Sequence, residues 1–275
     1  MKRHLLILFL FLNILGCEKS EIESHPKKLK NCDLGYLLFS DNLRSINNSL
    51  IVYPPNSGSN IFSYLYQNNQ IVRVNGGLIP IASGSNLSKE LLSPLAFDSI
   101  VYTGEDIYLY QKMDINGSII EKDLSPGIFT LDSKKRLKKI NRKDAFNMNG
   151  YDLFYAYADN QIVETDAVGR IRRKFYFEND NLTKVVSQFA NIQGDVTLSE
   201  EILFQDYDDK PNPFKNLYYV TGAFYRAFSK NNYTSYTINH FGLLPDGSFG
   251  INGTFWGTLQ IRYNAENYPM FGDYE

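Results

Sequence analysis

The sequence contains little histidine, cysteine or tryptophan. Its 275 residues include three His, two Cys and one Trp. His4 and His25 lie near the N-terminus, so His240 is the one imidazole beyond residue 33. A Ser-His-Asp or Cys-His site needs a His base beside its nucleophile, and no G-x-S-x-G sequence is present, which disfavours nucleophilic catalysis. Two Cys are too few for a disulfide scaffold or a metal centre.

The sequence also lacks an excess of charge of either sign. The 28 Lys and Arg against 30 Asp and Glu give a net charge of −2, which disfavours a nucleic-acid partner. Basic residues cluster at 134–143, where a solvated hairpin is favoured over a site for acidic polysaccharide or lipid headgroups. The densest acidic groups are Glu200–Glu201 and Asp206, Asp208 and Asp209. The second group resembles a calcium loop but lacks its Gly and distal Glu, so we assign no metal, cofactor or catalytic residue.

Long apolar runs are absent except at the N-terminus. Lys2 and Arg3 precede eight apolar residues, which is too short for a membrane span of about 20 residues and indicates an export signal. The following Ile14-Leu15-Gly16-Cys17 resembles the lipobox of bacterial lipoproteins. That resemblance implies that residues 1–16 are removed and that Cys17 carries lipid. The alternative is an ordinary signal peptide with an incidental Cys17, which would allow a disulfide with Cys32.

A polar tether is expected after the lipid anchor. Residues 17–33 are polar and predict a flexible link to a single β-rich domain at 34–275. Glu18, Glu21 and Glu23 resemble the acidic stretch that sends some Bacteroidota lipoproteins to the cell surface, although a solvated linker is an equal alternative. We therefore expect an outer-membrane lipoprotein on the periplasmic or cell-surface face.

The domain is rich in residues that form strands and turns. The full sequence contains 20 Tyr, 19 Phe and 27 Asn, most of them in this domain. One pattern recurs, in which apolar residues at i and i+2 precede a polar turn of about four residues and then an apolar residue. The copies start at Tyr64, Phe129, Tyr155, Phe175 and Ile261. Each copy predicts a β-hairpin. We expect a mostly β fold, an open or curved antiparallel meander of hairpins with one or two short helices.

The hairpin pattern resembles known families. The segment 150–190, in which a turn with Gly169 separates two hairpins, is similar to the YD-repeat units of Rhs-type proteins. The lipobox, residues 208–214, Ser229–Asn232 and the final 261–269 resemble a group of small Bacteroidota lipoproteins of unknown function. This resemblance implies a fold and a location but no activity.

A few further elements are predicted locally. Asn86 or Ser88 can cap a helix through Leu92, and Asn212 followed by Pro213 predicts a second helix at 213–219. Residues 98–110 predict two strands around Gly104-Glu105-Asp106. The alternation at 236–241 predicts a strand that carries His240.

The aromatic residues at 218–256 are the candidate binding groups. Aromatic faces stack on sugars or bind partner proteins, which singles out Tyr225, Tyr236 and Trp256. The interpretation favoured for the aromatic set is that the rings fill the core or pair across strands, because a β protein with few Leu must build its core from other residues. Our leading hypothesis is a non-enzymatic module that binds a glycan or an envelope protein. The alternatives are a structural envelope scaffold and, third, a carboxylate-based hydrolase.

Overall fold

The computed structural model describes most of the expected β-rich domain. The described residues are 50–52, 63–68, 70–81, 89–121, 126–142, 151–190, 196–220, 223–258, 261–263 and 269–270. The expected signal peptide, the lipid site Cys17, the tether and Cys32 lie outside these residues. Among the described residues, no helix is long and apolar enough to cross a membrane.

The described chain is almost entirely β-strand. The first strands are β1 (Leu50–Val52), β2 (Ser63–Gln67), β3 (Gln70–Ile81), β4 (Lys89–Thr103), β5 (Asp106–Ile115), β6 (Ser118–Glu121), β7 (Gly127–Leu131) and β8 (Leu137–Arg142). The next are β9 (Tyr151–Ala158), β10 (Gln161–Asp166), β11 (Ile171–Glu178), β12 (Asn181–Ala190) and β13 (Val196–Tyr207). The 3₁₀ helix η1 (Arg226–Phe228) precedes β14 (Tyr233–Leu243), β15 (Phe249–Thr258), β16 (Arg262–Tyr263) and β17 (Pro269–Met270).

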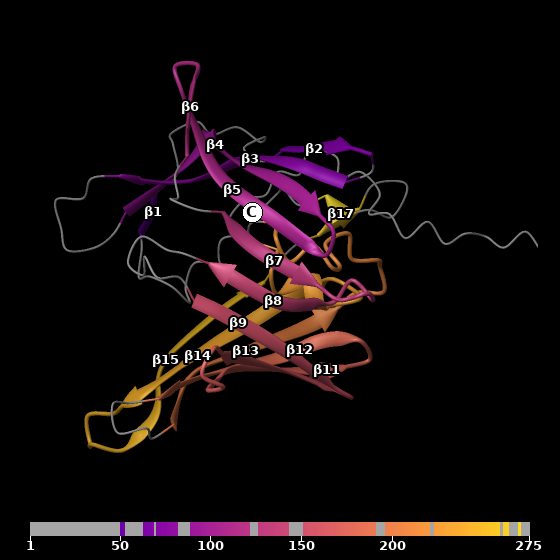
Figure 1. Ribbon diagram of the computed structural model, residues 1–275. Coiled ribbons are helices and arrows are strands. Elements are labelled where there is room, and N and C mark those ends of the chain that lie inside the picture. Colours follow the sequence, from indigo (N-terminus) through magenta and orange to yellow (C-terminus); the bar gives the residue numbers. More distant parts are fainter. Residues whose placement is uncertain are drawn as a thin grey trace, which may run out of the picture.

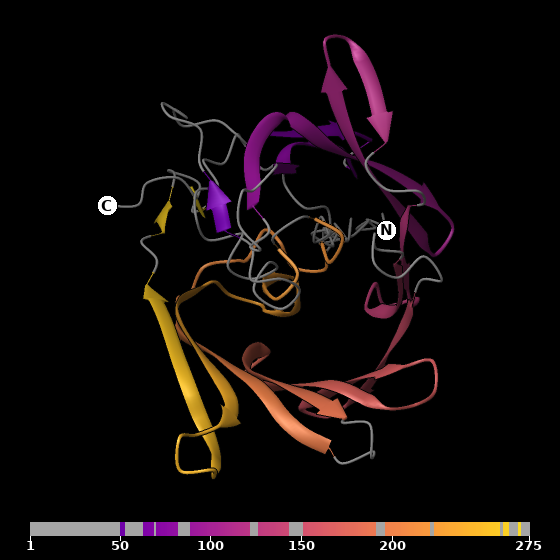
Figure 2. The ribbon, with the colours of Figure 1, turned by 90° about the vertical axis from the view of Figure 1, so that its left-hand side faces the viewer.

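Fifteen of these strands form one sheet, which confirms the predicted antiparallel meander (Figure 1). Its order follows the chain from β2 to β15, except that β6 pairs beside β5 and β1 pairs in parallel with β4. The sheet curls around the segment that links β13 to β14, and its two ends, β15 and β2, do not pair with each other (Figure 2).

The predicted hairpins form where the sequence pattern places them. Units that start at Tyr64, Phe129, Tyr155 and Phe175 become β2–β3, β7–β8, β9–β10 and β11–β12. Three of the loops are tighter than the expected four residues, because the ladders continue to end pairs such as Gln67 with Gln70. The fifth copy falls partly on residues 264–268, outside the described residues, although β16 and β17 pair on either side of it.

Two turns share the same side-chain clamp. In the turn after β10, Asp166 Oδ1 accepts hydrogen bonds from the backbone N–H groups of Val168 and Arg170, and Arg170 Nε donates to Oδ2 at 2.8 Å. Asp132 and Arg136 make the equivalent bonds in the turn after β7. The fourth residue of each turn has a positive φ, and Gly169 at 82° supplies the conformation that the sequence predicts.

The two predicted helices are wrong. Lys89–Leu92 belongs to β4, because this segment pairs with β3 on one side and in parallel with β1 on the other. At 213–219, Asn212 Oδ1 does accept the expected capping bond from the Phe214 N–H at 2.9 Å. The chain then makes turns rather than a helix, because Asn216 adopts a φ of 67° and donates its N–H to Ala227 O. The two strands predicted around Gly104–Asp106 are β4 and β5.

Residues 212–229, apart from the undescribed 221–222, form an inner segment that fills the concave side of the sheet (Figure 2). Inward side chains from β3 to β5 and from β7 to β14 belong to the same buried core, including Phe129, Phe175 and Phe204. The inner segment contributes six buried aromatic rings, Phe214, Tyr218, Tyr219, Phe224, Tyr225 and Phe228. Aromatic rings therefore supply much of the core.

Candidate functional site

The three predicted binding residues do not come together. Tyr225 lies on the inner segment and is 1% exposed, whereas Tyr236 lies on β14 and is 6% exposed. The Tyr236 ring lies over Gly257 on β15, where a Cβ atom would approach it to 2.7 Å. Trp256 points to the opposite, outer face and is 75% exposed. Of the three, Trp256 alone is available to a partner.

A buried ion pair holds the interior around Tyr225. Glu164 on β10 lies opposite Arg173 on β11, and Arg173 Nε and NH2 donate to the two carboxylate oxygens at 2.8 and 2.6 Å. Tyr155 donates its hydroxyl to Glu164 Oε2 at 2.7 Å, and Arg173 NH1 donates to the Tyr225 hydroxyl at 3.1 Å. Burial and the Glu164 charge raise the pKa of Tyr155 well above its ordinary value. This network joins three strands to the inner segment, and both carboxylate oxygens are already engaged.

Glu200 and Glu201 do not form a catalytic pair. They are neighbours on β13, so their side chains point to opposite faces of the sheet. Glu200 is buried on the inner face, where His240 Nδ1 lies 3.6 Å from its Oε2. Glu201 lies on the outer face and accepts a hydrogen bond from Asn239 Nδ2 at 3.3 Å. The acidic and imidazole groups therefore link neighbouring strands.

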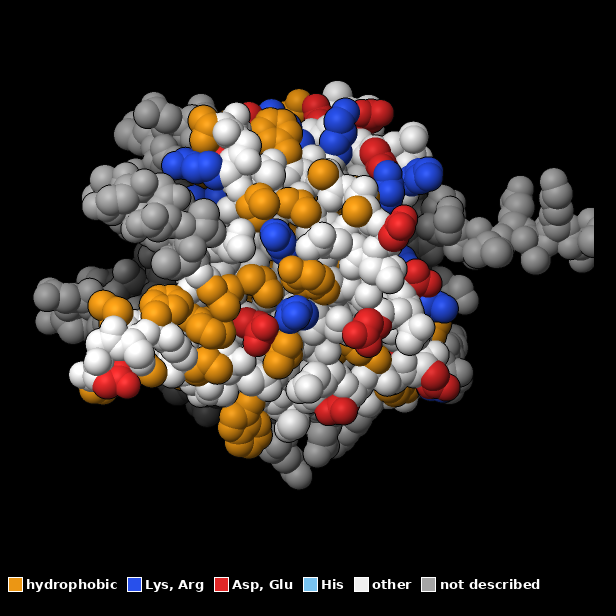
Figure 3. Space-filling view, turned by 90° about the horizontal axis from the view of Figure 1, so that it is seen from below, with side chains coloured by type: hydrophobic (Ala, Val, Ile, Leu, Met, Phe, Trp, Pro, Cys, Tyr) orange, Lys and Arg blue, Asp and Glu red, His pale blue; other side chains and the backbone are white. Residues whose placement is uncertain are grey.

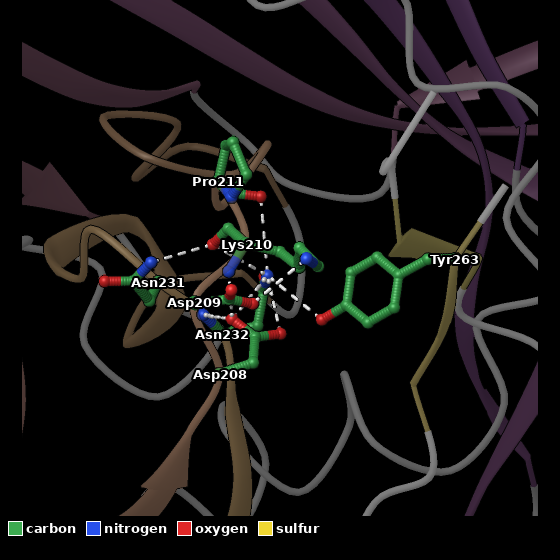
Figure 4. A network of polar contacts seen from close by, with 7 residues as sticks. All are labelled: Asp208, Asp209, Lys210, Pro211, Asn231, Asn232 and Tyr263. Carbon is green, nitrogen blue, oxygen red and sulfur yellow. Dashed lines mark hydrogen bonds and ion pairs between the residues drawn. The ribbon is translucent and has the colours of Figure 1, made fainter. Parts of the chain in front are cut away.

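The acidic run after β13 shapes a turn (Figure 4). Asp208 Oδ1 accepts hydrogen bonds from the backbone N–H groups of Lys210 and Asn232 at 3.0 and 3.1 Å. Asp206 instead accepts a bond from the Ser235 hydroxyl, and Asp209 pairs with Lys210 Nζ at 3.1 Å. Across the part of the chain that the structure describes, no group of three or more His, Cys, Asp or Glu side chains could hold a metal.

The basic run lies largely on the β7–β8 hairpin. Lys134 and Lys135 are exposed in its turn. Arg136 pairs with Asp132 at 2.7 Å, and Lys139 pairs with Asp152 at 3.0 Å on the neighbouring strand. Lys143 lies outside the described residues. Nearby carboxylates therefore pair with two of these basic side chains, Arg136 and Lys139.

The most distinctive surface lies on the terminal hairpin, β14–β15. Leu243, Phe249, Ile251 and Trp256 lie on the outer face and are 75%, 51%, 50% and 75% exposed. We call these four residues the terminal apolar face. Hydrophobic side chains gather over this side of the sheet, mixed with a few charged ones (Figure 3).

Strand pairing explains why these side chains share a face. Leu243 pairs with Phe249, Phe241 pairs with Ile251, and Thr237 pairs with Trp256. Asn252 is an extra, bulged residue, which restores Ile251 and Trp256 to the same side although their numbers differ by an odd count. Sequence reasoning missed Leu243 and Ile251 because it counted aromatic rings only. The available signal was the set of glycines at 250, 253 and 257. They leave few side chains on one face of β15, so most of its apolar side chains lie on the other face.

Comparisons with known proteins assign the chain to no family. No protein-family model matches the chain, and no curated protein matches it. Similar solved structures include a porin-like protein from Bacteroides vulgatus, with 13% identity and a TM-score of 0.39, covering 72% of this chain and 89% of that one. A porin-like protein from Bacteroides uniformis has 11% identity and a TM-score of 0.38, covering 76% and 85%.

Proposed function

We propose that this protein is an exported lipoprotein that binds an envelope protein through the terminal apolar face and catalyses no reaction. The lipobox at Cys17 and the positive N-terminus support the lipid anchor and an outer-membrane location. The observation that carries the binding proposal is the exposure of Leu243, Phe249, Ile251 and Trp256 on one outer face.

The chemistry of this face favours a protein over a glycan. Leu243 and Ile251 offer no hydrogen bond to a sugar hydroxyl, whereas aliphatic and aromatic side chains together suit an apolar protein surface. Fully burying one large apolar side chain stabilises an interface by about 1.5–3 kcal/mol. Trp256→Ser should therefore weaken partner binding by roughly 30-fold, which corresponds to about 2 kcal/mol.

Photo-crosslinking in growing cells tests the proposal directly. Benzoylphenylalanine replaces Phe249 in the full chain, and in a matched control it replaces Phe154, which is 39% exposed on β9. We expect light-dependent adducts with another envelope protein at position 249 and few at position 154. Adducts with a second copy alone would favour the structural scaffold instead. No adduct at 249, or equal adducts at both positions, would refute the proposed face.

A further inference from the structure

Among the residues that the structure describes, strand β15 is an edge strand of the large sheet. One side of it pairs with β14, and no described strand pairs with its other side. The bulge at Asn252 interrupts the strand, so its regular stretch is Gly253–Thr258. The outward backbone N–H and C=O groups of this stretch form a template on which another strand can add.

The composition of β15 is unusual for an edge. Natural sheets protect their edges with charged residues, proline or bulges, and β15 has the bulge but neither charge nor proline in Phe249–Thr258. Strand β11, inside the sheet, carries four charged residues: Arg172, Arg173, Lys174 and Glu178. An edge strand that would need charge to prevent pairing therefore has none.

An uncharged strand is suited to pairing with the same strand of a second copy. When two identical strands pair antiparallel about a two-fold axis, a residue close to the axis lies opposite or near its own copy, so a charge there would face a like charge. A two-fold axis perpendicular to the sheet also keeps both outer faces on the same side. Phe255, 46% exposed on the inner face, and Trp256 on the outer face would then both gain neighbours across the new ladder.

We propose that β15 pairs antiparallel with β15 of a second copy and joins the two sheets edge to edge. The inference deepens the proposed function and rests on it, because the dimer would serve to bind the same partner. In the dimer, two terminal apolar faces would lie side by side and form one bivalent surface. A partner with two matching sites would then bind more tightly than either face alone allows.

Cysteine scanning tests the two-fold axis. Single Cys replacements at positions 253–258 are made in the full chain, with Cys32→Ser in the background, and each protein is oxidised in detergent. Only the residue on the axis lies opposite itself, because one step away along each strand already separates the two Cα atoms beyond disulfide range. We expect one position to give at least about tenfold more linked dimer than the others. Thr237→Cys, one strand inward on the same face, and the Cys32→Ser parent serve as controls.

Charge at the edge gives an independent measurement. Thr254→Lys places like charges near each other in the dimer and should weaken self-association at least about tenfold by light scattering. The matched variant Thr237→Lys lies on β14, on the same face of the sheet as Thr254, and should leave self-association unchanged. Far-UV circular dichroism checks that both variants fold. Monomeric mass in the parent, a flat cysteine scan, or equal association of the two Lys variants would overturn the inference. Adducts at position 249 with another protein would still support the proposed function, so the two can fail separately.

Discussion

The ion pair between Glu164 and Arg173 gives a quantitative test of the interior. Arg173→Met keeps much of the side-chain volume but leaves the Glu164 carboxylate, in a residue 1% exposed, without its cation. Removing one partner of a buried ion pair typically costs about 3–5 kcal/mol, because an uncompensated charge stays buried. The Arg173 side chain is 18% exposed, so water reaches part of the site and we expect the lower end, about 3 kcal/mol.

Urea unfolding of the full chain, followed by far-UV circular dichroism, measures this loss. Arg170→Met is the matched control, because Arg170 pairs with Asp166 at 2.8 Å but its side chain is 61% exposed. Such exposed pairs contribute about 0–1 kcal/mol. The double variant Glu164→Gln with Arg173→Met should recover most of the loss, since no charge remains buried. If Arg173→Met cost no more than Arg170→Met, the reasoning about this network would be refuted.

Three further outcomes are expected. Burial raises the pKa of Tyr102 and Tyr218 to about 12, above the unfolded value near 10. Their contribution to stability is therefore intact below about pH 10 and is lost as the pH rises toward 12. The tyrosinate absorbance of the folded chain should stay below that expected for ordinary tyrosines until the chain unfolds in that range, and early ionisation of all tyrosines would contradict this. Lys135 and Gly169 occupy the same turn position with φ of 61° and 82°, so Gly169→Ala should destabilise by about 1 kcal/mol while Lys135→Gly is neutral or stabilising, as measured by urea midpoints. Cys17→Ala should abolish labelling by a fatty-acid probe and release the protein from membranes, and persistent labelling would rule out lipid at this residue.

The hairpins could be predicted from the sequence because each depends on neighbouring residues. A pattern such as Tyr155-x-Tyr157 with Ile162 specifies two strand faces and a polar turn within eight residues. The helix expected to end at Leu92 does not form because the segment pairs with distant strands: β1 pairs with it from 39 residues away, as in Leu50 with Lys89, and β3 pairs on its other side. Local capping signals cannot register such a ladder.

The interior and the candidate site depend on contacts that no local pattern reveals. Arg173 meets Tyr225 across 52 residues, so the sequence could not show that this tyrosine is a core residue. Tyr236 and Trp256 looked equivalent as aromatic residues, but they belong to opposite faces of paired strands. Their separation depends on the register of β14 against β15, which places Tyr236 over Gly257 and turns Trp256 outward.

Strand β15 contributes little to the core, so its outer side chains can be replaced with little effect on folding stability. No residue of Phe249–Thr258 belongs to the buried core among the described residues. Gly253 and Gly257 face inward, so the strand is held mainly by its ladder with β14 and by the Tyr236 ring. Trp256 therefore adds exposed apolar area without stabilising the fold. Trp256→Ser should change the unfolding free energy by no more than about 0.5 kcal/mol, while it weakens partner binding by the roughly 30-fold given above. A loss of several kcal/mol would show instead that the ring is structural, and would remove the strongest reason to regard this face as a binding surface.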